Sequence, residues 1–474
     1  MKIIMAASEM TPFAKTGGLA DVVGSLPNAL AKRGHEVMVF IPFYRCVDAP
    51  SAELVLEGCL TVGSRPSHFK IYLIARSHGV RVFAIRKEEY FDRPGLYGMA
   101  ERDFDDNPER FAFFSQAVMH AITALRLEAH ILHAHDWQTA LIPVYAQVNH
   151  SGTSAPIRTL FTIHNLAYQG AFDSHAFAYT NLPGHFFSMN GLEFYGRVCF
   201  MKGGILFADR VNTVSRRHAM EIQTSEHGFG LDGVLRARQS SLSGIMNGVD
   251  YLAWNPETDP QLPQNFGAGT LARKQRCKSA LTKELGLGYT DQKPVFGMVS
   301  RLAQQKGCDL LLRALPEMLQ SGALFAILGS GGPGYEEALQ QLSEKHPSQF
   351  AFKTGYNDGL ARRIYGGSDF FLMPSLYEPC GLSQLYAMRY GTIPVVRATG
   401  GLDDSVQAWD SQMRRGTGIK FQKADSAGLI GAFDGAMEAY RNPKIMATLR
   451  QNAMAADFSW DQSAAEYESL YQKL

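Results

Sequence analysis

The residues with the clearest potential for chemistry form a lysine-glycine segment at residues 15–21, where Lys15 precedes two adjacent glycines and an aspartate follows them. An apolar segment at residues 3–7 predicts a buried parallel strand before it, and apolar residues at helical spacing up to Gly34 predict a helix after it. Glycines let the backbone approach a ligand, and the amides that open a helix favour an anion beside a lysine charge. The segment therefore predicts a phosphate-side loop. A tight turn whose glycines serve packing alone is the alternative, because the spacing matches neither common phosphate-loop motif.

Two further cations, Arg301 and Lys306, follow an apolar strand pattern at residues 295–299 and precede a helical pattern. A planar guanidinium and a point-charge ammonium at a strand end, beside a helix start, suit a diphosphate. A pair of solvated surface cations is the alternative.

Glu378 follows another strand pattern and opens a helical one. A carboxylate there can complement the helix dipole or bind sugar hydroxyls, while the amides from Gly381 onward can face a phosphate. Cys380 could be a nucleophile, but no activating histidine lies nearby in the sequence, which favours a small buried side chain.

Histidines end two of the expected strands in the first half. His133 and His135 share one strand face and precede Asp136, so a metal cluster is conceivable, although no matching further ligands follow in the sequence. His164 and Asn165 end the strand expected at 158–163. They could line a cleft, or the histidine could be structural.

Composition bounds the class of protein. A chain of 474 residues with 46% hydrophobic and 19% charged residues exceeds one core and predicts two domains of an ordinary globular enzyme. A net charge of +1 argues against nucleic acid as a partner. The six cysteines form no CxxC pair, which indicates neither zinc nor a disulfide framework and favours a reducing cytoplasm. The apolar start is too short for a signal peptide, and no segment is long enough to cross a bilayer.

Strand-like and helix-like segments alternate through both halves, so we expect two doubly wound domains with ligands at the carboxyl ends of their strands. Turn-forming residues place the boundary near residue 247, giving domains at 1–246 and 247–456 and a helix at 457–474 that packs back on the first domain. The sequence Thr-Gly-Gly-Leu occurs at residues 16–19 and again at 399–402, one glycine loop in each half. Strands are expected at 36–41, 69–74, 80–85, 131–135, 158–163, 211–214, 295–299, 324–328, 350–354, 369–373 and 393–396, helices at 108–125 and 139–148, and an insertion at 168–200.

Taken together, these motifs resemble the bacterial glycogen synthases and the related starch synthases, family 5 of the retaining glycosyltransferases. The matching segments follow the order of the family and cover nearly the whole chain: residues 15–21, 133–137, 162–170, 247–250, 300–302, 305–307, 378–382, 399–402 and 457–460. Each motif alone is weakly specific, whereas the ordered set is highly specific.

The resemblance implies an α/β protein with the GT-B fold, two Rossmann-like domains that face a deep interdomain cleft. It implies transfer of glucose from ADP-glucose to the nonreducing 4-hydroxyl of an α-1,4-glucan, glycogen or a maltooligosaccharide, with retention of configuration and release of ADP. The setting is cytoplasmic, and no cofactor, metal, nucleic acid or membrane is expected.

In similar proteins Arg301 and Lys306 hold the donor diphosphate, Glu378 contacts glucose hydroxyls, and a ring at Tyr356 lies beside the adenine. The catalytic residues implied by the resemblance are Lys15, Asp136, His164, Arg301, Lys306 and Glu378. The substrate-binding residues it implies are Gly17, Gly18, Asp21, Asn165, Asn247, Tyr356, Cys380, Gly381 and Leu382.

One departure from other transferases of this fold concerns the helical segment that follows Glu378. Many retaining transferases of this fold carry a second glutamate seven residues after the first, where this chain has Leu385. The glycogen synthase branch also lacks this second glutamate. The family places His164 where a retaining glycosidase has its nucleophilic carboxylate, which favours front-face attack by the acceptor. The alternatives are a transferase that uses UDP-glucose and a noncatalytic glucan- or nucleotide-sugar-binding protein. A phosphorylase is disfavoured, since no pyridoxal-phosphate lysine signature is present.

Overall fold

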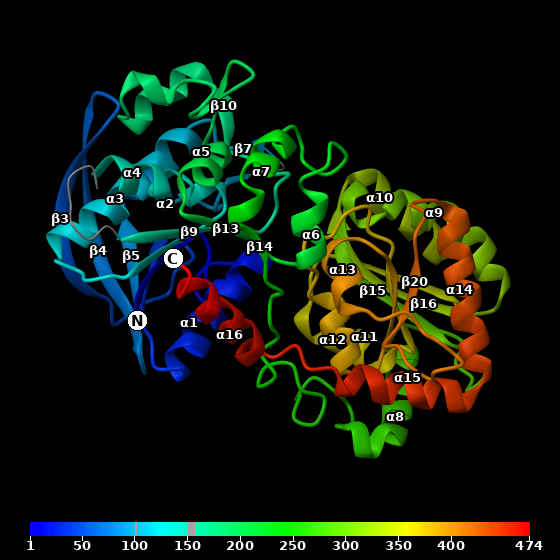
Figure 1. Cartoon of the computed structure of the whole chain (residues 1–474). Coiled ribbons are helices and arrows are strands. Elements are labelled where there is room, and N and C mark those ends of the chain that lie inside the picture. Colours follow the sequence, from blue (N-terminus) through cyan, green and yellow to red (C-terminus); the bar gives the residue numbers. More distant parts are fainter. Residues whose placement is uncertain (100–101, 150–156) are drawn as a thin grey trace. The chain divides into compact units, whose positions relative to one another are not determined.

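Buried apolar strands form a sheet in each half of the chain, mostly parallel in the first half and parallel throughout in the second. The computed structural model describes residues 1–99, 102–149 and 157–474, and these fall into two compact units. The first unit comprises Met1–Gly248 and Trp460–Leu474, and the second comprises Val249–Ser459. Each unit has its own hydrophobic core, with helices covering its sheet (Figure 1).

The sheet of the first unit has nine strands in the order β14-β13-β9-β8-β1-β2-β5-β4-β3. The strands from β14 to β5 in that order pair in parallel, and β4 and β3 extend the sheet antiparallel. Their bounds are β1 (Lys2–Ala6), β2 (Glu36–Pro42), β3 (Glu53–Val62), β4 (Arg65–Ser77), β5 (Val80–Arg86), β8 (Ile131–His135), β9 (Arg158–Ile163), β13 (Arg210–Thr213) and β14 (Leu242–Gly244). The central strands are buried on both faces, as parallel strands between helical layers must be.

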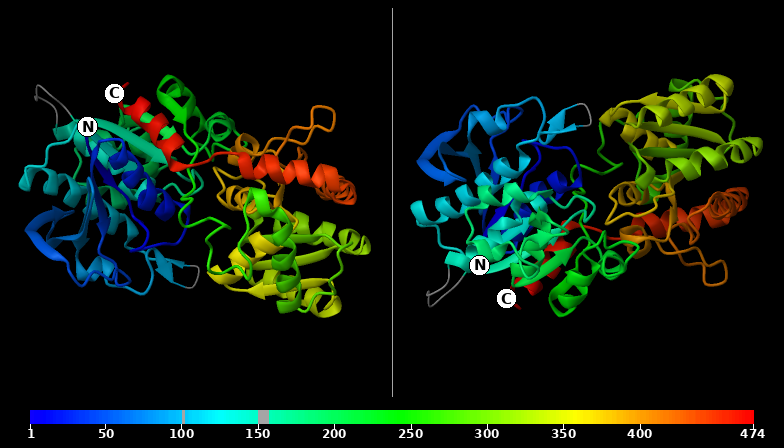
Figure 2. Two further views of the ribbon diagram at one scale, coloured as in Figure 1. Left: turned by 90° about the horizontal axis from the view of Figure 1, so that it is seen from below. Right: turned by 90° about the horizontal axis from the view of Figure 1, so that it is seen from above.

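Helices cover this sheet: α1 (Gly18–Lys32), α2 (Glu88–Phe91), α3 (Asn107–Ala124), α4 (Leu141–Asn149), α5 (Phe200–Phe207), α6 (Arg216–Glu221), α7 (Asp232–Ala237) and α16 (Trp460–Tyr471). The insertion expected at 168–200 contains a small sheet of β10 (Ala171–Asp173), β12 (Arg197–Cys199) and β11 (Glu193–Phe194), and a separate ribbon joins β6 (Gly98–Met99) and β7 (Arg102–Asp103). The last helix, α16, lies beside α1, where Glu468 accepts hydrogen bonds from Arg33 at 2.9 Å and pairs with His35 at 3.1 Å (Figure 2).

The sheet of the second unit is parallel throughout, in the order β17-β16-β15-β18-β19-β20. Its strands are β15 (Val295–Leu302), β16 (Leu324–Gly331), β17 (Phe350–Thr354), β18 (Phe370–Met373), β19 (Ile393–Arg397) and β20 (Ile419–Phe421). Its helices are α8 (Lys274–Glu284), α9 (Cys308–Gln320), α10 (Pro333–Lys345), α11 (Asp358–Gly367), α12 (Ser383–Arg389), α13 (Gly400–Ser405), α14 (Ser426–Arg441) and α15 (Pro443–Ala455).

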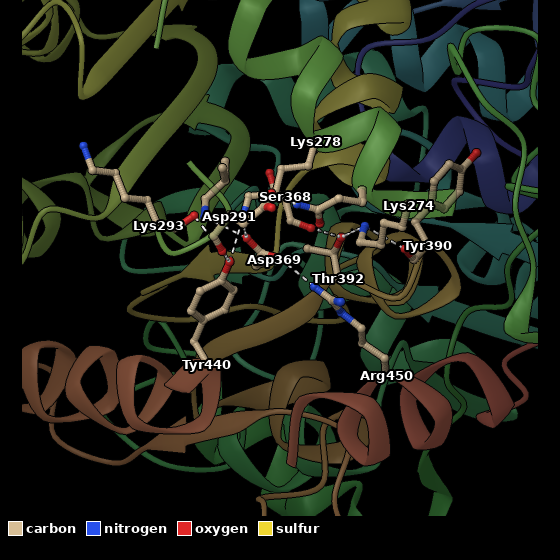
Figure 3. Close-up of polar contacts among 12 residues, drawn as sticks. Lys274, Lys278, Asp291, Lys293, Ser368, Asp369, Tyr390, Thr392, Tyr440 and Arg450 are labelled. Atoms are coloured by element: carbon tan, nitrogen blue, oxygen red, sulfur yellow. Dashed lines mark hydrogen bonds and ion pairs between the residues drawn. The ribbon is translucent and has the colours of Figure 1, made fainter. Parts of the chain in front are cut away.

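A buried ionic cluster fastens helices to the amino-terminal edge of this second sheet (Figure 3). Asp369, just before β18, pairs with Lys278 of α8 at 2.7 Å and with Arg450 of α15 at 2.6 Å. Nearby, the ammonium of Lys274 donates to the carbonyls of residues 365, 366 and 390 and to Thr392. Buried charges need this degree of pairing, so the cluster stabilises the fold. It lies at the amino ends of the strands, opposite the carboxyl ends where a ligand could bind.

The strands expected from the apolar runs are confirmed, from β1 at the start of the chain to β19, as are α3 and α4. Three strands of the two large sheets were not predicted, and neither were the short strands β6, β7, β10, β11 and β12. Strand β3 alternates with largely exposed positions at the sheet margin, and β14 and β20 have only three residues each, too few for a pattern. No helix within the described ranges is both long and apolar enough to span a bilayer.

Each sheet has a point at which its strand order reverses. In the first unit β1 lies between β8 and β2, and in the second β15 lies between β18 and β16. Loops that leave the carboxyl ends of two strands diverge at such a point and form a crevice in which doubly wound proteins bind ligands. The loops after β1 and β8, and those after β15 and β18, are therefore where the fold positions a site.

Candidate active site

The loop after β1 carries the lysine-glycine segment predicted from the sequence. The ammonium of Lys15 lies 2.7 Å from a carboxylate oxygen of Asp21, in the first turn of α1. Asp21 is half-buried, and this burial raises the pKa of its carboxyl despite the lysine beside it. The lysine is thus held at the start of α1 while remaining largely exposed.

Glu9 fixes this loop through hydrogen bonds, a role that sequence reasoning missed. Its buried carboxylate accepts hydrogen bonds from the amide of Thr16 at 2.5 Å, the hydroxyl of Thr16 at 2.6 Å and the amide of Gly17 at 3.1 Å. Tyr97 donates its hydroxyl to the same carboxylate at 2.7 Å. A lone glutamate before a glycine loop gives no motif, so only the contact identifies it.

The two glycines of the loop differ in what their amides can do. The amide of Gly17 is engaged with Glu9, whereas Gly18 is the first residue of α1 and its amide has no acceptor inside the helix. A Cβ on Gly17 would meet no atom within 4 Å, and its φ of −153° is extended backbone. Open space at residue 17 and a helix-start amide at residue 18 leave this loop accessible to an anion.

Asp136 directly follows β8 and fixes the backbone just after the neighbouring strand β9. One of its oxygens accepts the amide hydrogen of His164 at 2.7 Å and that of Asn165 at 3.4 Å. Its φ of 58° is the left-handed conformation that a non-glycine residue adopts only at an energetic cost. Burial raises the pKa of the Asp136 carboxyl to about 7, although the two amides favour the charged form.

His164 is buried, and its Nε2 lies 3.0 Å from Nδ1 of His135. Burial lowers the pKa of His164 to about 3, so its imidazole is neutral near pH 7. Asn165 accepts the amide hydrogen of Ala167 at 3.1 Å, which fixes the turn that follows. These residues form a polar but uncharged wall at the switch point.

Asn247 also belongs to the first unit, after β14. The residue is buried, and its amide oxygen has no hydrogen-bond partner among the described residues. A buried acceptor without a partner is uncommon, and here it marks a group able to receive a ligand hydroxyl.

At the switch point of the second unit a lysine and a glutamate form a tight pair. Lys306 ends η6 (Gln304–Lys306) after β15, and its ammonium lies 2.6 and 2.9 Å from the two carboxylate oxygens of Glu378, which follows β18. Ser375 donates to the same carboxylate at 3.0 Å. Arg301, at the end of β15, is exposed, and its side chain contacts no described residue by ion pair or hydrogen bond. The structure thus places an accessible guanidinium and a paired ammonium on neighbouring segments.

The segment after Glu378 is a close-packed backbone turn. Gly381 has a φ of 72°, and Gln384 donates from its amide to the carbonyls of Cys380 at 3.1 Å and Gly381 at 2.9 Å. Cys380 is buried, as expected for a small packed side chain, and Leu382 precedes α12. The turn is a rigid support for Glu378.

The second glycine loop contacts the same turn. A Cβ on Gly400 would lie 2.0 Å from the carbonyl oxygen of Glu378, and one on Gly401 would lie 2.0 Å from that of Cys380. The amide of Gly401 donates to the carbonyl of Glu378 at 3.0 Å. Only residues without a side chain permit this approach, so the loop positions the Glu378 segment.

Tyr356 follows Gly355, whose φ is 90°, beyond the end of β17. The ring is 71% exposed, and its hydroxyl lies 3.1 Å from Asp358. A large exposed ring at a strand end is available to stack on a ligand.

The predicted residues therefore divide into two sets between the two units, and in each unit they follow the carboxyl ends of strands of its sheet. The first set is Lys15, Gly17, Gly18, Asp21, Asp136, His164, Asn165 and Asn247, and the second is Arg301, Lys306, Tyr356, Glu378, Cys380, Gly381 and Leu382. Glu9, His135 and Ser375 join these sets through contacts that no motif announced. No three His, Cys, Asp or Glu side chains of the described residues converge as a metal-binding group.

Two doubly wound α/β units, each with polar residues at the carboxyl ends of its strands, have the architecture of the GT-B fold. The catalytic domain of starch synthase IV from Arabidopsis thaliana, bound to ADP and acarbose, superposes with a TM-score of 0.90 at 33% identity over 100% of this chain and 98% of that one. Sucrose-phosphate synthase from Thermosynechococcus elongatus shares the fold alone, with a TM-score of 0.62 at 16% identity over 100% and 98% of the chains.

Sequence comparisons give the same answer. Residues 2–237 match the starch synthase catalytic domain and residues 286–453 match the glycosyl transferases group 1 domain. The glycogen synthases of Koribacter versatilis and Opitutus terrae are each 44% identical over 100% of this chain and 98% and 99% of their own lengths. The chain belongs to the glycogen and starch synthase family of glycosyltransferases. The fold class and the family predicted from the sequence are confirmed.

Proposed function

We propose that this glycosyltransferase transfers glucose from ADP-glucose to the nonreducing 4-hydroxyl of an α-1,4-glucan, with retention of configuration and release of ADP. Relatives named glycogen synthase that match the full chain at 44% identity support the reaction. The ADP bound to the similar starch synthase IV supports an adenine nucleotide as the donor. The observation that carries the proposal is the Lys306–Glu378 pair, with exposed Arg301 at the end of the strand that leads to Lys306, at a topological switch point.

The second unit would hold the donor. Arg301 offers a planar fork and Lys306 a point charge to the diphosphate, and the exposed ring of Tyr356 stacks on the adenine. Glu378 accepts hydrogen bonds from glucose hydroxyls while Lys306 offsets its charge. The backbone of residues 380–382 adds further donor contacts.

The first unit would supply a second set of contacts to the same reaction. Lys15, oriented by Asp21, and the amide of Gly18 complement the negative charge of the donor, with Gly17 leaving room beside them. The neutral imidazole of His164 and the amides of Asn165 and Asn247 face sugar hydroxyls, and Asp136 fixes the segment that carries His164 and Asn165.

The chemistry follows from where charge develops. As the bond to the diphosphate breaks, negative charge grows on the leaving group, and fixed cations stabilise it more in the transition state than in the ground state. One preorganised donor of this kind typically contributes about 3 kcal/mol. Double displacement would need a carboxylate nucleophile on the far face of glucose. We assign that place to neutral His164, so the acceptor attacks from the face that the diphosphate leaves.

The test is to incubate the purified protein with a short maltooligosaccharide and either ADP-glucose or UDP-glucose. We expect chains one glucose longer with ADP-glucose, an α-linkage by proton NMR, and stoichiometric ADP. Faster elongation with UDP-glucose would replace the donor but keep the reaction. Binding of both ligands without any elongation would show a noncatalytic glucan- or nucleotide-sugar-binding protein and overturn the proposal.

A further inference from the structure

Three buried imidazoles lie in a row in the first unit. His133 and His135 project from the same face of β8, with ring centroids 4.0 Å apart, and His164 follows at 5.3 Å from His135. The first two are fully buried and His164 is nearly so. A row of this kind connects His164, which the proposed function places at the sugar, to the interior of the unit.

Both ring nitrogens of His133 are already bound. Its Nε2 lies 2.7 Å from the hydroxyl of Thr162, and its Nδ1 lies 2.9 Å from the hydroxyl of Tyr471 on α16. The ring is therefore clamped between β9 and the last helix, and it presents a fixed face on which His135 rests.

His135 has one partnered and one unpartnered nitrogen. Its Nδ1 shares a hydrogen bond of 3.0 Å with Nε2 of His164, whereas its Nε2 is buried without a partner in the described part of the chain. Burial lowers the pKa of both histidines, so each carries one proton near pH 7. Because the shared hydrogen bond holds only one of those protons, the tautomers of the two rings are coupled.

Only two arrangements satisfy this count. If His164 donates through Nε2, the second nitrogen of His135 must carry a buried proton with no acceptor. If instead His135 donates through Nδ1, its Nε2 carries no proton and is an unpaired acceptor. The proton of His164 then lies on Nδ1 of His164. Buried donors without acceptors are the rarer case in folded proteins, so the second arrangement is favoured.

We propose that His135 is a positioning residue that donates to Nε2 of His164 and thereby holds His164 as a hydrogen-bond donor through Nδ1. His164 makes no other side-chain hydrogen bond to the residues that the structure describes, which leaves its Nδ1 proton for a ligand acceptor. The group that fits the Nδ1–H of His164 is a neutral hydrogen-bond acceptor such as a sugar hydroxyl. The contribution to turnover rests on the proposed function, whereas the tautomer assignment does not.

The direct experiment measures the tautomer of His164 in the unliganded protein. With histidine labelled by ¹⁵N, proton–nitrogen correlation spectra distinguish Nδ1–H from Nε2–H, and the signal is assigned by its loss in His164→Ala. We expect Nδ1–H in the wild type. An Nε2–H tautomer would overturn the proposal without any activity measurement, and a protein that transferred no glucose would overturn the proposed function while leaving this result standing.

Variants then test the role of the shared bond. An asparagine amide reaches the place of Nδ1, so His135→Asn should keep the tautomer and retain kcat within about 3-fold, whereas His135→Leu should scramble the tautomer and lower kcat by about 10-fold. Tyr471→Phe is the matched control, because it removes a hydroxyl from the same row without touching His164. Equal losses of kcat in all three folded variants, or an unchanged tautomer in His135→Leu, would contradict the proposal.

Discussion

Two glycine loops with the same Thr-Gly-Gly-Leu sequence, residues 16–19 and 399–402, occupy opposite environments. In the first loop both glycines are exposed, and a Cβ on Gly17 would meet nothing within 4 Å. In the second both are buried, and a Cβ on Gly401 would lie 2.0 Å from a carbonyl oxygen. The first loop leaves space that a ligand can enter, whereas the second lets two backbone segments touch. Identical motifs thus leave open space in one unit and allow close backbone packing in the other.

The charged pairs beside the two loops differ in the same direction. The side chains of Lys15 and Asp21 are 47% and 27% exposed, whereas those of Lys306 and Glu378 are 19% and 6% exposed. An exposed pair contributes at most about 1 kcal/mol to stability, but removal of one partner from a buried pair leaves an uncompensated charge. The second pair is therefore tied to the fold as well as to the proposed chemistry.

Replacement of these two lysines should give the largest effects. We expect Lys306→Met to lower kcat/KM by about 1000-fold, on the order of 4 kcal/mol, because a fixed cation is lost from the leaving diphosphate. The variant should also unfold at lower denaturant concentration, since among the described side chains Glu378 would retain only Ser375 as a partner. Lys15→Met should lower kcat/KM with little change in stability.

The control for the lysine experiment is Lys306→Met combined with Glu378→Gln. This double variant should recover stability by removing the unpaired carboxylate, but it should not recover activity. An unchanged rate in Lys306→Met would remove Lys306 from the donor site.

Gly401→Ala should have the next largest effect. The added methyl group cannot fit 2.0 Å from the carbonyl of Cys380, so the Glu378 segment must shift. Overpacking of this kind costs about 1–3 kcal/mol of stability, and displacement of a positioned carboxylate by even 1 Å should lower kcat by about 100-fold. Enzyme assays and thermal unfolding check both effects. Normal activity would show that the loop does not position Glu378.

Glu9→Gln tests what holds the first loop in place. A glutamine can place its side-chain NH2 group where Glu9 accepts a hydrogen bond from a backbone amide, so that two donors would face each other. The remaining hydrogen bonds from Thr16 and Gly17 lose the charge of their acceptor. We expect kcat/KM to fall by about 30-fold, roughly 2 kcal/mol, through a misplaced Lys15. Tyr97→Phe removes only one donor from the same carboxylate and should cost about 3-fold. Equal rates in wild type and Glu9→Gln would dismiss the positioning role.

Such supporting contacts mark where sequence reasoning ends. The strands could be predicted because strands buried on both faces are continuous apolar runs, and the motif residues could be placed because they follow those runs. The contact of Gly401 with Cys380, the bond of His135 to His164 and the hold of Glu9 on Thr16 could not. Each depends on tertiary packing that brings two segments to within hydrogen-bond distance, and no local pattern encodes that distance.

The buried carboxyl of Asp136 predicts an effect of pH on the stability of the first unit. Because its folded pKa of about 7 lies above the usual value of 3.8, its contribution to stability is fully present below pH 4 and is lost as the pH rises to about 7. Asp136→Asn does not titrate, so the wild type should lose roughly 1–2 kcal/mol relative to the variant between pH 4 and pH 8, less than the full shift because solvent reaches part of the carboxyl. Denaturant unfolding of both proteins across this range checks the sign. A difference independent of pH would contradict it.

Gly17→Ala should produce the smallest effect and sharpens the contrast between the loops most directly. The residue is extended and its surroundings are open, so alanine should leave the unfolding midpoint within about 0.5 kcal/mol of the wild type. Its methyl group would enter the space that we assign to the donor, which should raise the donor KM by about 5-fold, near 1 kcal/mol, with kcat nearly unchanged. Loss of stability comparable with that of Gly401→Ala would show that both loops are packing elements, and an unchanged KM would show that the donor does not approach the first loop.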